Sequence, residues 1–276
     1  MTRTDKPGAV RSLTQGAKAR IAIAAAAVAL AATVWGVATV VEPGRHPRDG
    51  NASRQSDDPA NPGSPGSPQQ VPDGLTHDSE SGRDAVNITI DDGPDPQWTP
   101  KVLQVLKKYD VKATFCMIGP QARDHPDLVK EVVAGGHRLC DHTMDHDVRM
   151  DKKPLEYQEK QILDAKKLIE QAAGDGVKVE YYRAPGGAFT PDSRRIAAAH
   201  GMRPLGWNVD SKDFSKPGAA AIVNTVKNEI RNGQTVLFHD GGGNRSQTVD
   251  ALDQVLSWLK AEGRPTGFPV RTGPSS

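Results

Sequence analysis

Two adjacent carboxylates, Asp91 and Asp92, stand at the end of an alternating apolar run and before a Gly-Pro pair. Residues 86–90 read VNITI, a period-two pattern that is typical of a half-buried strand. Because neighbouring side chains on a strand point to opposite faces, the two carboxylates cannot clamp one ion together. Each Asp therefore has a separate role, or both are ordinary turn formers in front of Gly-Pro.

A pair of histidines, His142 and His146, lies four residues apart in the segment HTMDH. If this segment forms a helical turn, both imidazoles face the same side. Two imidazoles, one carboxylate and an open coordination position make a familiar catalytic zinc site. Surface histidines also occur at this spacing, and the glutamate of an HExxH metalloprotease is absent from the segment.

Short apolar runs alternate with helical patterns from Ala85 onward, which indicates repeated β-α units with parallel strands inside and helices outside. This part of the chain is shorter than the roughly 250 residues of a full eight-unit barrel, so a smaller or distorted barrel or an open sheet is expected. The expected strands are 85–90, 113–118, 137–142, 179–185, 202–209 and 235–240, and the expected helices are 99–109, 126–136, 155–173, 191–200, 219–231 and 247–262.

Polar residues gather where the expected strands end. These groups are Asp91-Asp92, His142 to His146, Arg183 to Gly187, Asp210 to Phe214, and His239-Asp240. In parallel α/β folds, catalytic groups lie at the carboxyl ends of the strands. The recurrence of such groups at one edge favours a functional site over a set of solvated loops.

The segments TIDDGP, HTMDH, RAPGG, DSKDF and LFH occur in the order of the motifs of the polysaccharide deacetylases. From about Ala85 to Gly263 the chain resembles this family, which is carbohydrate esterase family 4 and is also called the NodB homology domain. The resemblance implies a distorted, seven-stranded (β/α) barrel that removes acetyl groups from N-acetylated sugars, usually with zinc. The segment after Gly263 is a weak version of a final strand, so closure of the barrel stays open.

The resemblance assigns three residues to a metal ion. It implies that Asp92, His142 and His146 bind Zn²⁺, with Co²⁺ or another divalent metal as an alternative. Asp91 is implied as the general base that takes a proton from the attacking water, so the adjacent carboxylates have different targets. Thr143 is expected to order the loop between the histidines through its hydroxyl.

The remaining motif residues are implied to handle proton transfer and charge. His239 protonates the departing amine, which is a poor leaving group without that proton. Arg183 pairs with Asp91, and Asp213 bonds the far nitrogen of His239, although each pair also has a purely structural reading. The backbone N–H of Gly186 donates to the oxyanion, at a position where the family commonly has an aromatic residue.

The chain has only two cysteines, Cys116 and Cys140, which excludes a disulfide scaffold or a zinc ribbon. If their strands are neighbours, a disulfide could join them and brace the metal loop. Two buried free thiols are the alternative, and oxidising surroundings favour the bridge.

The N-terminal part divides into three segments. Residues 1–20 are basic, and residues 21–41 carry no charge and are long enough to cross a hydrocarbon core of about 30 Å. We expect an uncleaved transmembrane anchor with the C-terminal domain on the extracellular face of the plasma membrane; a cleaved signal peptide and a secreted protein are the alternative. Residues 42–84 are rich in Pro, Gly and Ser and predict a disordered linker.

The catalytic domain is expected to span residues 85–276. The net charge is +1 and no basic block occurs in the C-terminal two-thirds, so nucleic acid is not an expected partner. The expected activity is metal-dependent removal of acetyl groups from N-acetylglucosamine units of an extracellular polysaccharide, most readily peptidoglycan. The alternatives are a chitooligosaccharide deacetylase, an acetyl xylan esterase and a cell-wall-binding protein without turnover.

Overall fold

The computed structural model describes residues 70–273. The expected membrane span at 21–41 and most of the expected linker lie outside these residues. Among the helices of the described part, none combines the length and the apolar character needed to cross a bilayer.

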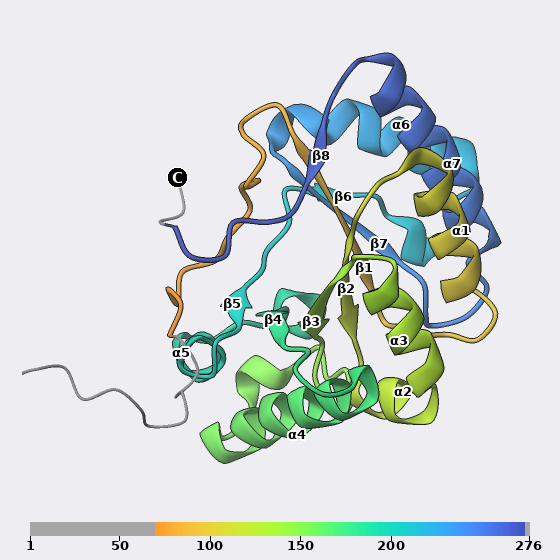
Figure 1. The fold of residues 1–276 in the computed structure, drawn as a ribbon. Coiled ribbons are helices and arrows are strands. Elements are labelled where there is room, and N and C mark those ends of the chain that lie inside the picture. The colour runs from red at the N-terminus through yellow and green to blue at the C-terminus, as the bar shows by residue number, and fades with distance from the viewer. Residues whose placement is uncertain (1–69, 274–276) are drawn as a thin grey trace, which may run out of the picture. The chain divides into compact units, whose positions relative to one another are not determined.

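One sheet forms the centre of the described fold, and its strands follow the order β5-β4-β3-β2-β1-β7-β6, with β8 paired to β1 (Figure 1). All of these pairings are parallel. The strands are β1 (Val86–Asp91), β2 (Thr114–Met117), β3 (Arg138–Asp141), β4 (Val179–Tyr182), β5 (Arg203–Pro204), β6 (Val209–Asp210), β7 (Thr235–His239) and β8 (Thr266–Gly267). The weak final strand of the sequence is thus the short β8.

The two edges of the sheet, β5 and β6, are consecutive in the chain and are joined by residues 205–208. A short connection between opposite edges requires the sheet to curl, so the expected distorted barrel is a curled parallel half-barrel that is open between β5 and β6. The single strand expected at 202–209 is in fact these two strands. Gly206 lies between them, and a β-carbon at Gly206 would collide with the ring of His77.

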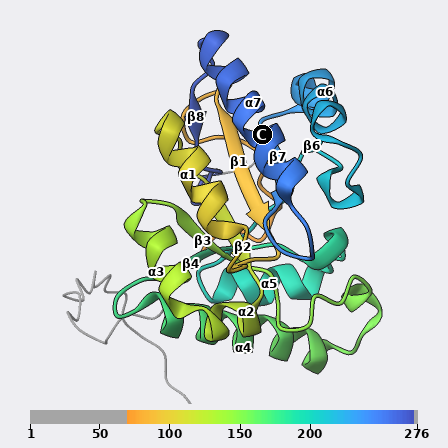
Figure 2. The same ribbon diagram turned by 90° about the vertical axis from the view of Figure 1, so that its right-hand side faces the viewer.

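Helices cover the outer face of the sheet, and Figure 2 shows α1 and α7 side by side over β1. The helices are α1 (Thr99–Tyr109), α2 (Gly119–Asp124), α3 (Pro126–Ala134), α4 (Leu155–Ala173), α5 (Pro191–Ala199), α6 (Ala219–Glu229) and α7 (Ser246–Ala261). The expected helices agree with these bounds to within two residues. The short α2 was not expected, because its GPQARD sequence has no apolar period.

Strand β1 is buried on both faces rather than on one. Val86, Ile88 and Ile90 join the apolar core beneath the helices, whereas Thr89 and Asp91 are on the alternate face. The alternation in the sequence therefore separates an apolar outer core from a polar barrel interior, not a core from solvent.

A disulfide joins Cys116 in β2 to Cys140 in β3, at positions that face each other in the register of the two strands. Both cysteines are fully buried and pack with Tyr181 and Leu205. The structure thus contains the bridge rather than two free thiols.

Residues 70–84, which were assigned to the linker, pack against the domain as an N-terminal strap. Thr76 forms a parallel bridge with Leu205, and Ser79 forms an antiparallel bridge with Pro269. Val71 and Thr76 are buried. The ordered chain therefore begins before the boundary expected near Asp84, and in Figure 1 the strap runs from near α5 toward β8.

Candidate active site

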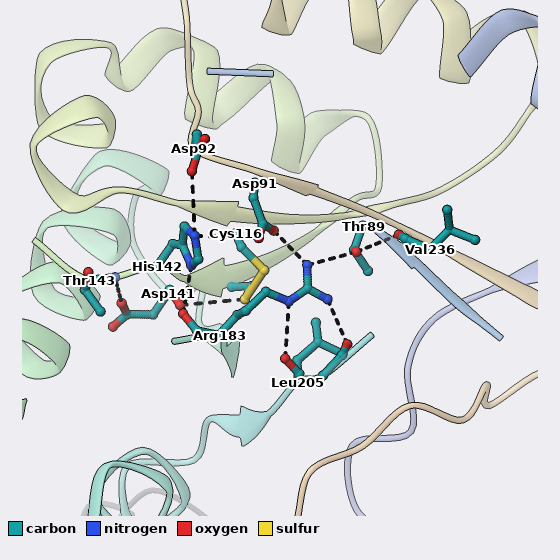
Figure 3. The surroundings of a disulfide bond; sticks show 12 residues. Thr89, Asp91, Asp92, Cys116, Asp141, His142, Thr143, Arg183, Leu205 and Val236 are labelled. Carbon is teal, nitrogen blue, oxygen red and sulfur yellow. Dashed lines mark hydrogen bonds and ion pairs between the residues drawn. A yellow bond between two sulfur atoms is a disulfide. The ribbon is translucent and has the colours of Figure 1, made fainter. Parts of the chain in front are cut away.

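A buried ion pair lies at the carboxyl end of β1. Arg183 donates from Nη1 to Oδ1 of Asp91 at 2.7 Å, and neither side chain is exposed by more than 3% (Figure 3). The same guanidinium donates to the Thr89 hydroxyl at 2.9 Å and to the carbonyls of Leu205 and Gly206 at 3.2 and 3.0 Å. A planar guanidinium group with this many fixed partners holds the Asp91 carboxylate in one orientation.

Asp92, His142 and His146 come together as a candidate metal centre. Their ligand atoms all lie within 4.8 Å of one another. Oδ1 of Asp92 is 3.2 Å from Nε2 of His146 and 3.6 Å from Nε2 of His142, and this buried oxygen has no hydrogen-bond partner within residues 70–273. A buried carboxylate that faces two ring nitrogens, with its own oxygen unsatisfied, fits a divalent cation such as Zn²⁺.

The ring of His142 is held in the tautomer that a metal ligand needs. Its Nδ1 lies 2.7 Å from the carbonyl oxygen of Arg183, and since a carbonyl only accepts, Nδ1 carries the proton. The lone pair is then on Nε2, which faces Asp92. Burial lowers the pKa of His142 in spite of the nearby carboxylates, so the neutral form is favoured.

Asp92 carries its charge at neutral pH. Burial opposes that charge, but His146, His142 and His239 outweigh it and hold the pKa of Asp92 well below its usual range. The close carboxylate of Asp92 raises the pKa of His146 against the effect of burial. A metal ligand must be neutral imidazole, so protonation of His146 competes with cation binding.

The segment between the two histidines is a loop and not the helical turn considered for this spacing. Thr143 and His146 have left-handed backbone conformations with φ of 70° and 51°, and the two rings meet edge to face with centroids 5.0 Å apart. Non-glycine residues with such values cluster at functional sites. The hydroxyl of Thr143 has no hydrogen-bond partner in the described chain, and its backbone N–H donates to Oδ1 of Asp141 instead.

His239 ends β7 and is tied to Asp213 by two hydrogen bonds. Nδ1 of His239 lies 2.7 Å from Oδ1 of Asp213, and the backbone N–H of His239 donates to Oδ2 at 2.8 Å. The hydroxyl of Thr248 also donates to Oδ2, which favours the ionised carboxylate. Burial opposes a charged ring, but Asp213 outweighs it and raises the pKa of His239 to about 9.

Comparisons with known proteins relate the chain to one family of enzymes. The polysaccharide deacetylase profile matches residues 78–205. A peptidoglycan-N-acetylglucosamine deacetylase from Bacillus cereus is 38% identical over 191 residues, which are 68% of this chain and 88% of that protein. The chain belongs to the polysaccharide deacetylase family. A second polysaccharide deacetylase, the chitooligosaccharide deacetylase of Sinorhizobium fredii, is 36% identical over 208 residues and covers 72% of this chain and 94% of that protein.

Solved polysaccharide deacetylases share the fold. One is a mutant of a CE4 family pseudoenzyme with restored enzymatic activity, which has a TM-score of 0.65 at 28% identity and covers 72% of this chain and 70% of that chain. Since the family fold is also that of a pseudoenzyme, activity depends on the side chains of the site and not on the fold alone.

The role of Gly186, like those of the other site residues, stays a prediction. Gly186 lies in the turn that follows β4, with φ of 59°, and its backbone N–H makes no hydrogen bond within the described fold. That amide is therefore available to a ligand.

Asp240, which the sequence assigned only to a strand end, supports the turn that presents Asp91 and Asp92. It is fully buried, accepts from the Thr99 hydroxyl at 2.6 Å, and would collide with a β-carbon at Gly93. Burial, together with the neighbouring carboxylates, raises the pKa of Asp240 to about 7. Glycine at position 93 of the polysaccharide deacetylase motif is thus required by this close approach.

Proposed function

We propose that this chain is a metal-dependent N-deacetylase that removes acetyl groups from N-acetylglucosamine units of peptidoglycan. The observation that carries the proposal is the Asp92-His142-His146 group, flanked by a fixed carboxylate, Asp91, and by a charged imidazole, His239. The name of the Bacillus cereus relative supports peptidoglycan as the substrate. Our proposal also places the domain outside the cell, attached through the uncharged residues 21–41.

The proposed reaction divides the proton transfers between two residues. A bound cation would polarise the acetamide carbonyl and acidify a water molecule. Asp91, aimed by Arg183, accepts the proton of the attacking water. His239, kept protonated by Asp213, donates to the departing nitrogen. The free N–H of Gly186 donates to the oxyanion of the tetrahedral intermediate.

A second candidate substrate is a chitooligosaccharide, which the name of the Sinorhizobium fredii relative favours. Acetate release by the full chain from peptidoglycan, from N-acetylglucosamine oligomers and from acetylated xylan separates these substrates. We expect release from peptidoglycan that stops when a chelator removes the metal. Faster release from the free oligomers would favour the second candidate, and release from xylan alone would favour an esterase.

Two substitutions distinguish the loss of the metal from the loss of the general base. Asp91→Asn should lower kcat by about 10²-fold or more while metal content stays near that of the wild type, because Asp91 takes the proton and is not a ligand. His142→Ala should lose both metal and turnover. As a control, Asp127→Asn removes a carboxylate from a side chain that is 93% exposed and should change neither.

Normal turnover in Asp91→Asn would contradict the assignment of the base. A wild-type chain that holds zinc but releases acetate from none of the three substrates would instead support the alternative hypothesis, that the chain binds the cell wall without turnover.

A further inference from the structure

One buried side chain outside the sequence motifs, Gln161 on α4, reaches the loop between the two histidines. Its Oε1 accepts from the backbone N–H groups of Met144 at 3.1 Å and Asp145 at 2.9 Å. Its Nε2 donates to Oδ2 of Asp145 at 2.6 Å. Gln161 is 5% exposed, Met144 is half-buried and Asp145 is exposed, so these bonds join a buried side chain to a loop at the surface.

The loop needs such support because its backbone is strained. Thr143 and His146 both have left-handed conformations, which persist only where the surroundings determine them. The N–H of Thr143 is held by the carboxylate of Asp141. The next two amides, which lead directly into His146, are both held by Gln161.

We infer that Gln161 is a positioning residue for the cation site and fixes His146 at its distance from Asp92. This inference rests on the metal centre of the proposed function. Support of a ligand by residues behind it typically contributes a factor of about 10 to 100 in metal affinity. Gln161 would act through the backbone of the loop rather than through the imidazole itself.

The same helix offers a matched control. Gln158 lies one turn earlier and is equally buried at 5% exposure. It donates to the carbonyl of Lys153 at 2.8 Å and accepts from the Thr190 hydroxyl at 2.6 Å, so its hydrogen bonds do not reach the segment between the histidines. Loss of Gln158 thus reproduces the damage to the helix without the damage to the loop.

The first measurement is the affinity of the metal-free full chain for Zn²⁺ alone, by competition with a chromophoric chelator. We expect Gln161→Leu to weaken zinc binding by about 10-fold or more, and Gln158→Leu to change it by less than about 3-fold. Equal losses in the two variants would overturn the inference, because they would mean general damage to α4.

A rescue tests the hydrogen bonds themselves. Gln161→Glu keeps the acceptor for both amides but places a second carboxylate beside Asp145, so zinc affinity should fall. The double variant Gln161→Glu/Asp145→Asn exchanges donor and acceptor across the third bond and should recover most of the affinity. If the double variant were no better than Gln161→Glu alone, the inference would be wrong.

A readout without metal separates this inference from the proposed function. In the metal-free chain, the amides of Met144 and Asp145 should exchange hydrogen at least about 10-fold faster in Gln161→Leu than in Gln158→Leu, because an amide must lose its acceptor before it exchanges. Unchanged exchange would overturn the inference. A chain that shows the expected zinc and exchange results but releases no acetate would overturn the deacetylase proposal alone.

Discussion

At the scale of single residues, Arg183 connects the two halves of the candidate site. Its guanidinium fixes Asp91, and its carbonyl oxygen fixes the tautomer of His142. The motif residues predicted the first contact, because a carboxylate base needs a cation beside it. They could not predict the second, because any residue supplies a carbonyl and only the turn after β4 aims this one.

The His239–Asp213 pair leads to a prediction about pH. His239 must be protonated to act as the acid, so kcat/KM should fall as pH rises through its pKa of about 9. Asp213→Asn removes the charge that raises this pKa. The decrease of kcat/KM at high pH, the basic limb of the profile, should therefore move to lower pH, and kcat should fall. A bound cation would lower the pKa of His239 in the wild type and in Asp213→Asn alike. The fall of kcat/KM would therefore still occur at lower pH in the variant than in the wild type.

The pH profile of kcat/KM for acetate release measures this shift. Ser211→Ala is the control, because it removes a hydroxyl that donates to Asp213 at 3.1 Å and leaves the carboxylate beside the ring. Its basic limb should stay near that of the wild type. A basic limb that did not move in Asp213→Asn would show that His239 is not the acid.

At the scale of elements, the disulfide between β2 and β3 fastens neighbouring strands whose ends lead toward the site. The cysteines are separated by 24 residues, and closing a loop of this length stabilises the folded state by about 3 kcal/mol in the chain-entropy account. The double variant Cys116→Ala/Cys140→Ala should lose about that much free energy of unfolding. Urea denaturation measures it, and two free thiols in denatured, unreduced wild type would contradict the bridge.

The elements also show where sequence patterns succeed and fail. Helix α4 was predicted with its observed bounds, because its apolar residues recur with the helical period over 19 residues. Strands β5 and β6 have two residues each and no period of their own, so they were merged into one. Gln161 was missed because a glutamine on an amphipathic helix has the same sequence signature whether it faces water or bonds a neighbouring loop.

At the scale of the whole molecule, the N-terminal strap was assigned to the linker because it has few apolar residues. It is held mainly by backbone hydrogen bonds, which composition does not report: Thr76 donates to Pro204, Gly206 donates to Thr76, and Glu80 donates to Phe268. The expectation of order from Ala85 onward followed hydrophobic content. The strap instead uses the unpaired backbone at the open edge of the curled sheet.

A comparison of two shortened chains tests the contribution of the strap. A chain that begins at residue 85 should have a Tm lower by about 5 °C or more than a chain that begins at residue 70, because it loses several backbone hydrogen bonds of about 1 kcal/mol each. Thermal unfolding followed by circular dichroism measures the difference. Equal Tm values would mean that residues 70–84 add nothing to the stability of the domain.

The strap pairs with Leu205, beside the carbonyls that grip Arg183. Mechanical tension on the chain upstream of Val71 would thus load the hydrogen bond between Val71 and Ala198 of α5 first, and then the β5 edge at Thr76, before it reached β1. A force strong enough to break the contact at Val71 would next act on the support of the Asp91 carboxylate.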